Sequence, residues 1–585
     1  MPGSPHRMVA ATAEVERGFA PGPSSIRQWG NTNAGPMHTA AICAVFALIS
    51  LLFTGSVFGI DNHLFHLPIV DRLYDEDQFA DDAFVQSLRY YSSGIWLLLA
   101  GVGRHAGDMH LMFHVLLYFS RMLAFVGFVC CASLVGIRSV RERCLFCLLL
   151  CFVEILDGTS LAGHGALFVS SFGHSEVANG TILLAIYFAA RAQIAVAIAF
   201  AGLTFFINAF MGVWLVLPLA CIIATLLWQG RIGLMRLPMR LAIGGIVSAA
   251  LAAPVLINIL SNADFGKNVD FDYAEFLRGY YGAHFFASSN PAYQLILLLG
   301  LAIVGWQALS RLKGGEIEFK AALAGMVGLY AIGVVVPALT SSPAILNLHL
   351  LRSGLMIHLL AAMSATALAT KWLTSDDGCE ATVLGPYLSF LLCIKYLLPA
   401  AVILFAGENA IRHRRAGIRD TALRAAILAA IGIVVIPWRA TQHFALSSAA
   451  DVAVSEWESV GSWAQHATSP QSMFLIALSE EAAGTAVDGR RSEALEVGSA
   501  VFEEASHRRI WIDFKRGAAV MWRPSYHAQW KARVEARQGL ESLGSTLRFA
   551  QANHIDYVIG DCRAFDGAHA EAVFHTADLC VGESR

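Results

Sequence analysis

The most acidic stretch of this sequence directly follows its first long apolar run. Six carboxylates fall within the twelve residues from Asp71 to Asp82. Packed carboxylates repel one another unless they bind a cation, share a proton or stay fully solvated. A carboxylate held in one place can also act as a general acid or base. The segment is therefore either a solvated acidic loop or a site for acid–base or metal chemistry.

Apolar residues within the same segment favour a fixed position for its charges. Phe79 and Phe84 flank Asp81 and Asp82 and are suited to anchor the loop on a membrane surface. Anchoring of this kind would hold both aspartates at one depth, where they could act on a bound molecule.

A second polar group stands at the entrance to a later apolar run. His164, His174 and Glu176 lie in or just after a Gly- and Ser-rich segment, and Asn208 begins the next turn on the same side. One interpretation is an interfacial cap whose hydrogen bonds are satisfied locally. The other is functional, with Glu176 assisting an acid–base residue, His174 binding a phosphate or a sugar hydroxyl, and Asn208 lining the same cavity.

Arg352 is a third candidate, because it lies near the end of an apolar run. A charge at the centre of a bilayer costs roughly 2.5–3.5 kcal/mol on insertion scales, so it usually faces protein or water. Arg352 either extends to the interface or, with His349, holds a phosphate group. Arginine suits the second role because its planar guanidinium offers paired donors to phosphate oxygens.

The composition indicates which elements must position these side chains. Of the 585 residues, 56% are hydrophobic and only 15% are charged. Soluble domains carry about 45–50% apolar and about 25% charged residues. The excess apolar surface needs lipid as its solvent, so we expect a membrane protein. The formal net charge of -3 gives no indication of nucleic-acid binding.

The pattern along the chain predicts an α-helical polytopic membrane protein with a small C-terminal α/β soluble domain. Residues 1–38 form an expected disordered cytoplasmic tail, 39–437 a transmembrane domain and 440–585 the soluble domain. Apolar runs between 39 and 437 predict about 11–13 transmembrane helices at roughly 20 residues each. The long loops expected on the outer face are 61–109, 157–175 and 261–290.

Arginine and lysine clusters set the expected orientation, because short cytoplasmic loops are rich in both. Three clusters place the N-terminal tail in the cytoplasm, but a fourth, Arg412–Arg419, falls outside if 383–407 is one span. If Lys395 instead marks a break between two short helices, this cluster is cytoplasmic and the soluble domain is periplasmic. We favour the break. Cys562 and Cys580 can then pair, since disulfides form in oxidising compartments.

The soluble domain has recognisable strand and helix patterns. A helix is predicted at Tyr526–Ala552, where leucines recur at helical spacing. The expected strands are Met473–Leu478, Arg509–Phe514, Tyr557–Gly560 and Ala572–Thr576.

Several phrases resemble a known superfamily. The run DQFADDAFVQSLRYYSSGIW, then INAFMGVWL at 207–215, HLLRSG at 349–354 and the tail phrases RRIWIDFK and HIDYVIGD look like GT-C-superfamily bacterial membrane proteins. They are closest to members of unknown function. The GT-C superfamily comprises membrane glycosyltransferases that use polyprenyl-phosphate-linked sugars. The chain lacks the WWD-type motif of the oligosaccharyl-transferring branch, which argues against protein N-glycosylation.

The resemblance implies a role for each candidate. Asp82 or Asp81 would be the acid–base residue, with Glu176 as its assistant, and Arg352 would bind the phosphate of the polyprenyl carrier. A divalent cation, Mg²⁺ or Mn²⁺, would be held by Asp75 and Asp77.

The implied function is transfer of a sugar to a glycan or lipid acceptor on the outer face of the bacterial inner membrane. Membrane lipid and the polyprenyl-phosphate-linked sugar would be its partners. Two alternatives remain open: a transporter or flippase of lipid-linked cargo, and a non-catalytic membrane scaffold.

Overall fold

A computed structural model describes residue 33 and residues 35–105, 107–412, 418–478, 493–540 and 542–584. Most of the expected N-terminal tail, residues 1–32 and 34, lies outside the described residues, and so do Arg414 and Arg415 of the fourth basic cluster. The first described helix, α2, begins at Pro36.

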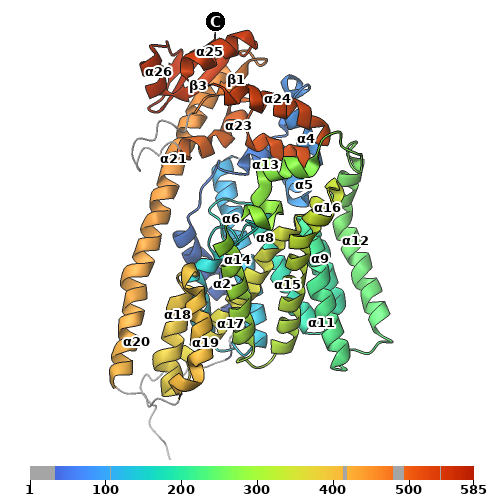
Figure 1. The fold of residues 1–585 in the computed structure, drawn as a ribbon, viewed down its shortest axis with the longest axis vertical. Coiled ribbons are helices and arrows are strands. Elements are labelled where there is room, and N and C mark those ends of the chain that lie inside the picture. Colours follow the sequence, from blue (N-terminus) through green and yellow to red (C-terminus); the bar gives the residue numbers. More distant parts are fainter. Residues whose placement is uncertain are drawn as a thin grey trace, which may run out of the picture.

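A bundle of helices forms the body of the protein (Figure 1). Within the described residues, eight helical segments are long enough and apolar enough to cross a membrane. They are α2 (Pro36–Thr54), α6 (Met109–Leu134), α10–α11 (Ala209–Trp228), α12 (Leu237–Ser261), α14 (Ala292–Leu309), α15 (Glu316–Leu339), α16–α17 (Pro343–Leu373) and α20–α21 (Asp420–Ala467). The expectation of a largely helical chain is confirmed.

Shorter helices complete the bundle. They are α7 (Val140–Phe152), α8 (His174–Ala190), α9 (Ile194–Ile207), α18 (Gly385–Leu392) and α19 (Leu398–Arg412). A short 3-10 turn, Lys395–Leu397, separates α18 from α19, so the predicted break at Lys395 is confirmed. The backbone N–H of Lys395 donates to the Glu154 carboxylate at 2.7 Å, which fixes this break against the end of α7.

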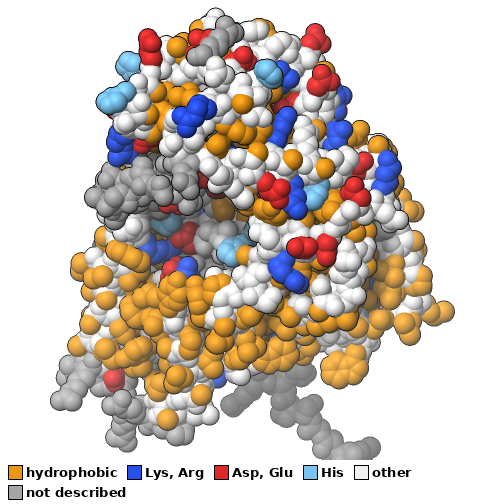
Figure 2. Space-filling view, turned by 45° about the horizontal axis from the view of Figure 1, so that its top comes forward, with side chains coloured by type: hydrophobic (Ala, Val, Ile, Leu, Met, Phe, Trp, Pro, Cys, Tyr) orange, Lys and Arg blue, Asp and Glu red, His pale blue; other side chains and the backbone are white. Residues whose placement is uncertain are grey.

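Helix α17 (Gly354–Leu373) is the centre of the bundle. Almost all its residues are buried, because it is apolar on every side and its small residues let neighbours approach closely. A Cβ atom at Gly305 of α14 would lie 2.9 Å from Ala361 Cβ. In contrast, α12 lies at the edge and exposes large apolar side chains such as Ile246 and Ile257. Apolar side chains cover the lower part of the face in Figure 2, and most charges gather above them.

The segment between α2 and α6 folds into an outer layer at one end of the bundle. It contains α3 (His63–Val70), α4 (Ala83–Ser87), α5 (Gly94–Leu99) and several 3-10 turns, and α13 (Tyr273–Phe285) lies at the same end (Figure 1). The buried members of this layer, such as Phe79 and Phe84, pack in one apolar cluster with the core of the C-terminal domain.

The C-terminal domain contains a five-stranded sheet in the order β2-β1-β3-β5-β4. β1 is parallel to β2 and β3, whereas β5 is antiparallel to β3 and β4. The strands are β1 (Met473–Ile476), β2 (Arg509–Ile510), β3 (Tyr557–Asp561), β4 (Phe574–His575) and β5 (Leu579–Glu583). The four expected strands are present, β2 and β4 in shortened form, and β5 is an addition.

The single helix expected at Tyr526–Ala552 is wrong. The segment forms two helices, α24 (His527–Gln538) and α25 (Leu543–Ala552). Gly539 ends the first, and the hydroxyl of Ser542 caps the second by accepting from the backbone N–H of Ser545. Two further helices are α23 (Phe502–Ser506) and α26 (Cys562–Ala568), and a disulfide joins Cys562 to Cys580.

Ionisable side chains join the C-terminal domain to the outer layer. His507 Nδ1 lies 2.9 Å from the Glu76 carboxylate, and His507 Nε2 lies 3.7 Å from Asp71. Glu504 is half-buried beside them, and His110 of α6 pairs with Glu458 of α21 at 2.5 Å. The same end is fixed by Trp522, whose indole N–H donates to the Ser87 carbonyl at 3.1 Å.

We expect this contact to weaken as the pH rises. Burial, and next the charge of Asp71, raise the pKa of Glu504 from 4.5 to about 7, so its contribution is lost as the carboxyl ionises between these values. The hydrogen bond to Glu76 raises the pKa of His507 above 6.5, and that contribution is lost as the pH rises through the raised value. Both groups therefore weaken the contact as the pH rises.

Hydrogen–deuterium exchange of residues 61–82 in detergent, corrected for intrinsic rates, measures the effect. The corrected exchange rate should increase between pH 5.5 and 8.5. In Glu504→Gln this increase should be smaller. Exchange that is independent of pH in the unsubstituted protein would contradict the assignment.

Candidate functional site

Arg352 lies at the outer end of the central helix without a carboxylate partner. It belongs to the 3-10 turn Leu350–Ser353, which joins α16 (Pro343–Leu346) to α17. Its buried Nε atom has no hydrogen-bond partner, and Nη2 donates to the carbonyl of His164 over a long 3.4 Å. Among the described residues no aspartate or glutamate pairs with it. A guanidinium in this state has hydrogen-bond donors of the kind that anions accept from.

Histidines from separate parts of the chain surround this guanidinium. His164 comes from the loop after α7, His174 is the first residue of α8, His284 lies in α13 and His349 precedes the Arg352 turn. The charge of Arg352 acts on all four. His164, His174, His284 and Arg352 itself are each partly exposed, so the cluster is open to solvent.

Burial and the arginine charge keep these rings neutral. Burial is the main cause that lowers the pKa of His164 below its usual range, and the charge of Arg352 lowers it further. The same two causes lower the pKa of His284 to about 3. The site therefore holds a single positive charge, on Arg352, surrounded by neutral imidazoles.

The backbone around Arg352 adopts conformations that are rare for residues with side chains. Ala162, His164 and His349 have φ values of 45°, 53° and 50°. Gly163 has a φ of +125°, and a Cβ atom there would lie 2.6 Å from the carbonyl oxygen of Leu351. The His164 loop therefore lies directly against the Arg352 turn. Strained backbone of this kind persists where the surroundings hold it, and it concentrates at functional sites.

Side chains from three helices hold the strained loop. The amide oxygen of Gln294 in α14 accepts from the Ala162 N–H at 3.0 Å, and the Tyr330 hydroxyl of α15 donates to the Ala162 carbonyl at 3.2 Å. His284 Nδ1 of α13 lies 3.2 Å from the Gly163 carbonyl.

Hydrogen bonds assign the tautomers of two of the histidines. The indole N–H of Trp96 donates to His174 Nδ1 at 3.0 Å, so the proton of neutral His174 is on Nε2, which is a donor. A carbonyl only accepts, so His284 Nδ1 carries the proton toward Gly163, and its Nε2 keeps a free lone pair. The two rings thus offer opposite functions to a ligand.

Aromatic side chains of the outer layer extend the site toward the C-terminal domain. His66 stacks on Trp96 with ring centroids 3.8 Å apart, and its Nε2 lies 3.3 Å from the Tyr91 hydroxyl. Tyr91 contacts His174 and Trp522 with centroids 5.6 Å and 5.4 Å away. Burial raises the pKa of Tyr91, which keeps its hydroxyl protonated.

Glu176 pairs with an arginine other than Arg352. It forms a fully buried ion pair with Arg121 of α6, with Nε to Oε1 at 2.5 Å. The same guanidinium donates to Ser50 and Thr54 of α2 at 2.7 Å and 3.1 Å. Arg121 is therefore fully paired, and the group joins α2, α6 and α8.

The aspartates of the first loop face the C-terminal domain. Asp82 caps α4 by accepting from the Val85 N–H at 3.0 Å, and its charge acts on Glu503 and Arg516 of that domain. Asp81 is exposed. The structure gives no contact between either aspartate and Arg352.

The remaining candidates from the sequence are the two predicted metal ligands, Asp75 and Asp77. Asp75 pairs with Arg72 and Arg89 at 2.5 Å and 2.9 Å, and Asp77 is exposed. Across the described ranges, no three His, Cys, Asp or Glu side chains are arranged to hold a metal ion.

Asn208 adjoins the histidine cluster. It caps α10 (Ala209–Trp214), and its amide nitrogen donates to the hydroxyl of Ser175 at 3.1 Å, next to His174. Of the residues singled out from the sequence, the structure thus brings together Arg352, His349, His164, His174 and, beside them, Asn208.

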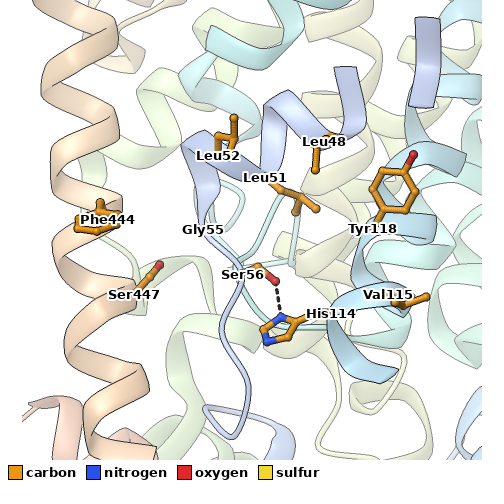
Figure 3. A pocket seen from close by; sticks show the side chains of 10 residues that line it. All are labelled: Leu48, Leu51, Leu52, Gly55, Ser56, His114, Val115, Tyr118, Phe444 and Ser447. Carbon is orange, nitrogen blue, oxygen red and sulfur yellow. Dashed lines mark hydrogen bonds between the residues drawn. The ribbon is translucent and has the colours of Figure 1, made fainter. Parts of the chain in front are cut away.

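A separate groove opens between α2, α6 and α21 (Figure 3). Its volume is about 510 Å³, and at its polar end the Ser56 hydroxyl lies 2.6 Å from His114 Nδ1. Its lining residues are Leu48, Leu51, Leu52, Gly55, Ser56, His114, Val115, Tyr118, Phe444 and Ser447. None of them belongs to the Arg352 cluster.

Comparison with known proteins places the chain in no family. No family model matches the sequence, and no curated protein matches it.

We expect Glu176 to be needed for stability. Glu176→Ala leaves the Arg121 charge buried without its partner, and breaking a buried pair costs about 3–5 kcal/mol. The unfolding temperature in detergent should fall by several degrees, and Arg121→Leu with Glu176→Leu should recover most of it. Glu318→Ala, which breaks a pair whose Arg231 is half-exposed, is the matched control and should have a smaller effect. An unchanged unfolding temperature for Glu176→Ala would show that the pair is not structural.

Proposed function

We propose that this protein is a GT-C-like membrane glycosyltransferase that moves a sugar from a polyprenyl-phosphate-linked donor to a glycan or lipid acceptor. The observation that carries the proposal is the unpaired guanidinium of Arg352 among neutral histidines. Transfer of a sugar from such a donor leaves a lipid phosphate. Preorganised cationic and N–H donors stabilise the charge that develops on this leaving group.

The position of the cluster supports a reaction at a membrane surface. Arg352 precedes the apolar helix α17, and Tyr91 beside it belongs to the outer layer under the C-terminal domain. A phosphate at Arg352 would therefore sit where a lipid headgroup lies, with its hydrocarbon chain in the bilayer.

The alternatives find less support. A transporter or flippase would need polar groups gathered near the middle of the bilayer. The Arg352 cluster instead lies where α8, α13 and α17 begin or end. A purely structural scaffold gives no reason for a charge without a partner, since such a charge lowers stability.

The proposed location is the bacterial inner membrane with the C-terminal domain in the periplasm. This domain lies at the same end as the outer layer, and its Cys562–Cys580 disulfide suits an oxidising compartment (Figure 1).

Cysteine labelling tests this orientation. Glu571 is exposed in the C-terminal domain, and Lys313 is exposed in the turn between α14 and α15 at the opposite end. Relative to the unsubstituted chain, Glu571→Cys should react with a membrane-impermeant maleimide in spheroplasts. Lys313→Cys should react only after permeabilisation. The reverse pattern would place the domain in the cytoplasm.

Binding of a lipid phosphate tests the site itself. Charge-assisted hydrogen bonds contribute about 1.5–3 kcal/mol, so Arg352→Gln should weaken binding of geranylgeranyl phosphate in detergent about 10- to 100-fold. Arg352→Lys should lose part of this affinity, because it keeps the charge but not the paired donors. Binding is measured by isothermal titration calorimetry, with geranylgeraniol as the uncharged ligand.

Arg89→Gln is the matched control, because Arg89 lies in the same outer layer but already pairs with Asp75. It should bind the lipid phosphate as the unsubstituted protein does. Equal affinity of the unsubstituted protein for the phosphate and the alcohol would refute the proposed function.

A further inference from the structure

The proposed transfer needs a base, and the carboxylates of the chain are poorly placed to provide it. As the acceptor oxygen attacks the sugar carbon, its proton must be taken up. Glu176 is held in its pair with Arg121, and Asp82 caps α4 beside Arg516. A base beside the phosphate site must therefore come from the groups that surround Arg352.

The tautomers of the cluster distinguish a donor from a base. His174 receives the Trp96 proton on Nδ1, so it presents an N–H and suits a phosphate oxygen. His284 donates from Nδ1 to the Gly163 carbonyl, so it presents the lone pair of Nε2. His349 is buried, and its ring packs against Phe285 with centroids 4.5 Å apart. His284 is thus a partly exposed ring whose hydrogen bond leaves a nitrogen free to accept a proton.

We propose that His284 is the general base of the transfer and that an anionic donor bound at Arg352 activates it. This inference rests on the proposed function. The acceptor oxygen bonds to the sugar carbon, the bond from that carbon to the phosphate oxygen breaks, and the bonding electron pair leaves on the phosphate. Arg352 and His174 receive the phosphate, and the acceptor proton passes to Nε2 of His284.

The hydrogen bond to Gly163 orients the base and stabilises its charged form. Catalytic histidines in general have one ring nitrogen that reacts and a second that is fixed by an acceptor. Here the acceptor is the carbonyl of a loop held by Gln294 and Tyr330, so the ring has a defined orientation. The Gly163 oxygen favours the imidazolium that forms during transfer.

The charges that face His284 explain the activation. They are Arg352 and, from the C-terminal domain, Lys515, and the neutral but titratable rings of His164 and His349 lie beside them. Without a ligand, burial and Arg352 lower the pKa of His284 to about 3, so the ring stays neutral but is a weak base. A bound phosphate offsets the Arg352 charge and adds a negative one, which raises the pKa. The base becomes strong only when the donor is in place.

Proton uptake on binding tests this proposal without turnover. Calorimetric titration of geranylgeranyl phosphate at pH 6, in buffers of different ionisation enthalpy, should show net uptake of a proton by the unsubstituted protein. His284→Asn keeps a donor in the place of Nδ1 but has no counterpart of Nε2. It should bind within about threefold of the unsubstituted protein and lose most of the uptake.

His114→Asn is the matched control. His114 lines the separate groove between α2, α6 and α21 and is outside the Arg352 cluster. It should retain the proton uptake. A sugar-transfer assay should show a 10²- to 10⁴-fold lower kcat for His284→Asn with little change in KM, which is the usual contribution of a general base.

The outcomes separate the two proposals. If the unsubstituted protein does not bind the lipid phosphate, the proposed function fails. If it binds without proton uptake, or His284→Asn keeps the uptake, only the role of His284 fails. The same holds if Asp82→Asn abolishes transfer while His284→Asn retains it. If His284→Asn does not fold, His284→Gln is measured in its place, and absence of uptake in the unsubstituted protein still rejects the role of His284.

Discussion

An arginine without a counter-ion is the constraint on which the site depends. Removing a guanidinium from water costs several kcal/mol, and most such groups in proteins recover this through a carboxylate. Arg121 does so with Glu176. Among the described residues, the Arg352 guanidinium has one long hydrogen bond, to the His164 carbonyl, so the rest of the fold must supply the stability that this charge costs. The unpaired charge of Arg352 lowers stability until an anion binds to it.

The architecture around Arg352 follows from that cost. The central helix α17 is buried on all sides, so it holds the turn before it in place. The His164 loop, strained at Ala162 and Gly163, closes against the turn and is held by α13, α14 and α15. Since neutral histidines rather than carboxylates come next to the charge, the site stays net positive. Their neutrality follows mainly from burial, and the charge of Arg352 adds to it.

The sequence predicted those structural features that depend on a local pattern of residues. The length of the apolar runs predicted the helices, the lone Lys395 predicted the break between α18 and α19, and short strand-like segments of the soluble domain predicted β1 and β3. The sequence also singled out Arg352, His349, His164 and His174, because a charge or an imidazole next to an apolar run is conspicuous. His284 was not found as a site residue, because in the sequence it belongs to an aromatic segment typical of any membrane interface. Only the tertiary fold brings it to Gly163 and Arg352.

The acidic residues show why charge alone is a weak guide to chemistry. Asp75, Asp82 and Glu176 stood out by type and spacing, but the fold gives each a partner: two arginines, a helix N-terminus and a buried guanidinium. The structure gives no contact between these carboxylates and Arg352, whereas His284 lies in the Arg352 cluster with a free lone pair. The partner of Glu176 comes from α6, far from it in the chain, so this pairing is not visible in the sequence. In this protein the chemistry is expected where a polar group has been left without a partner.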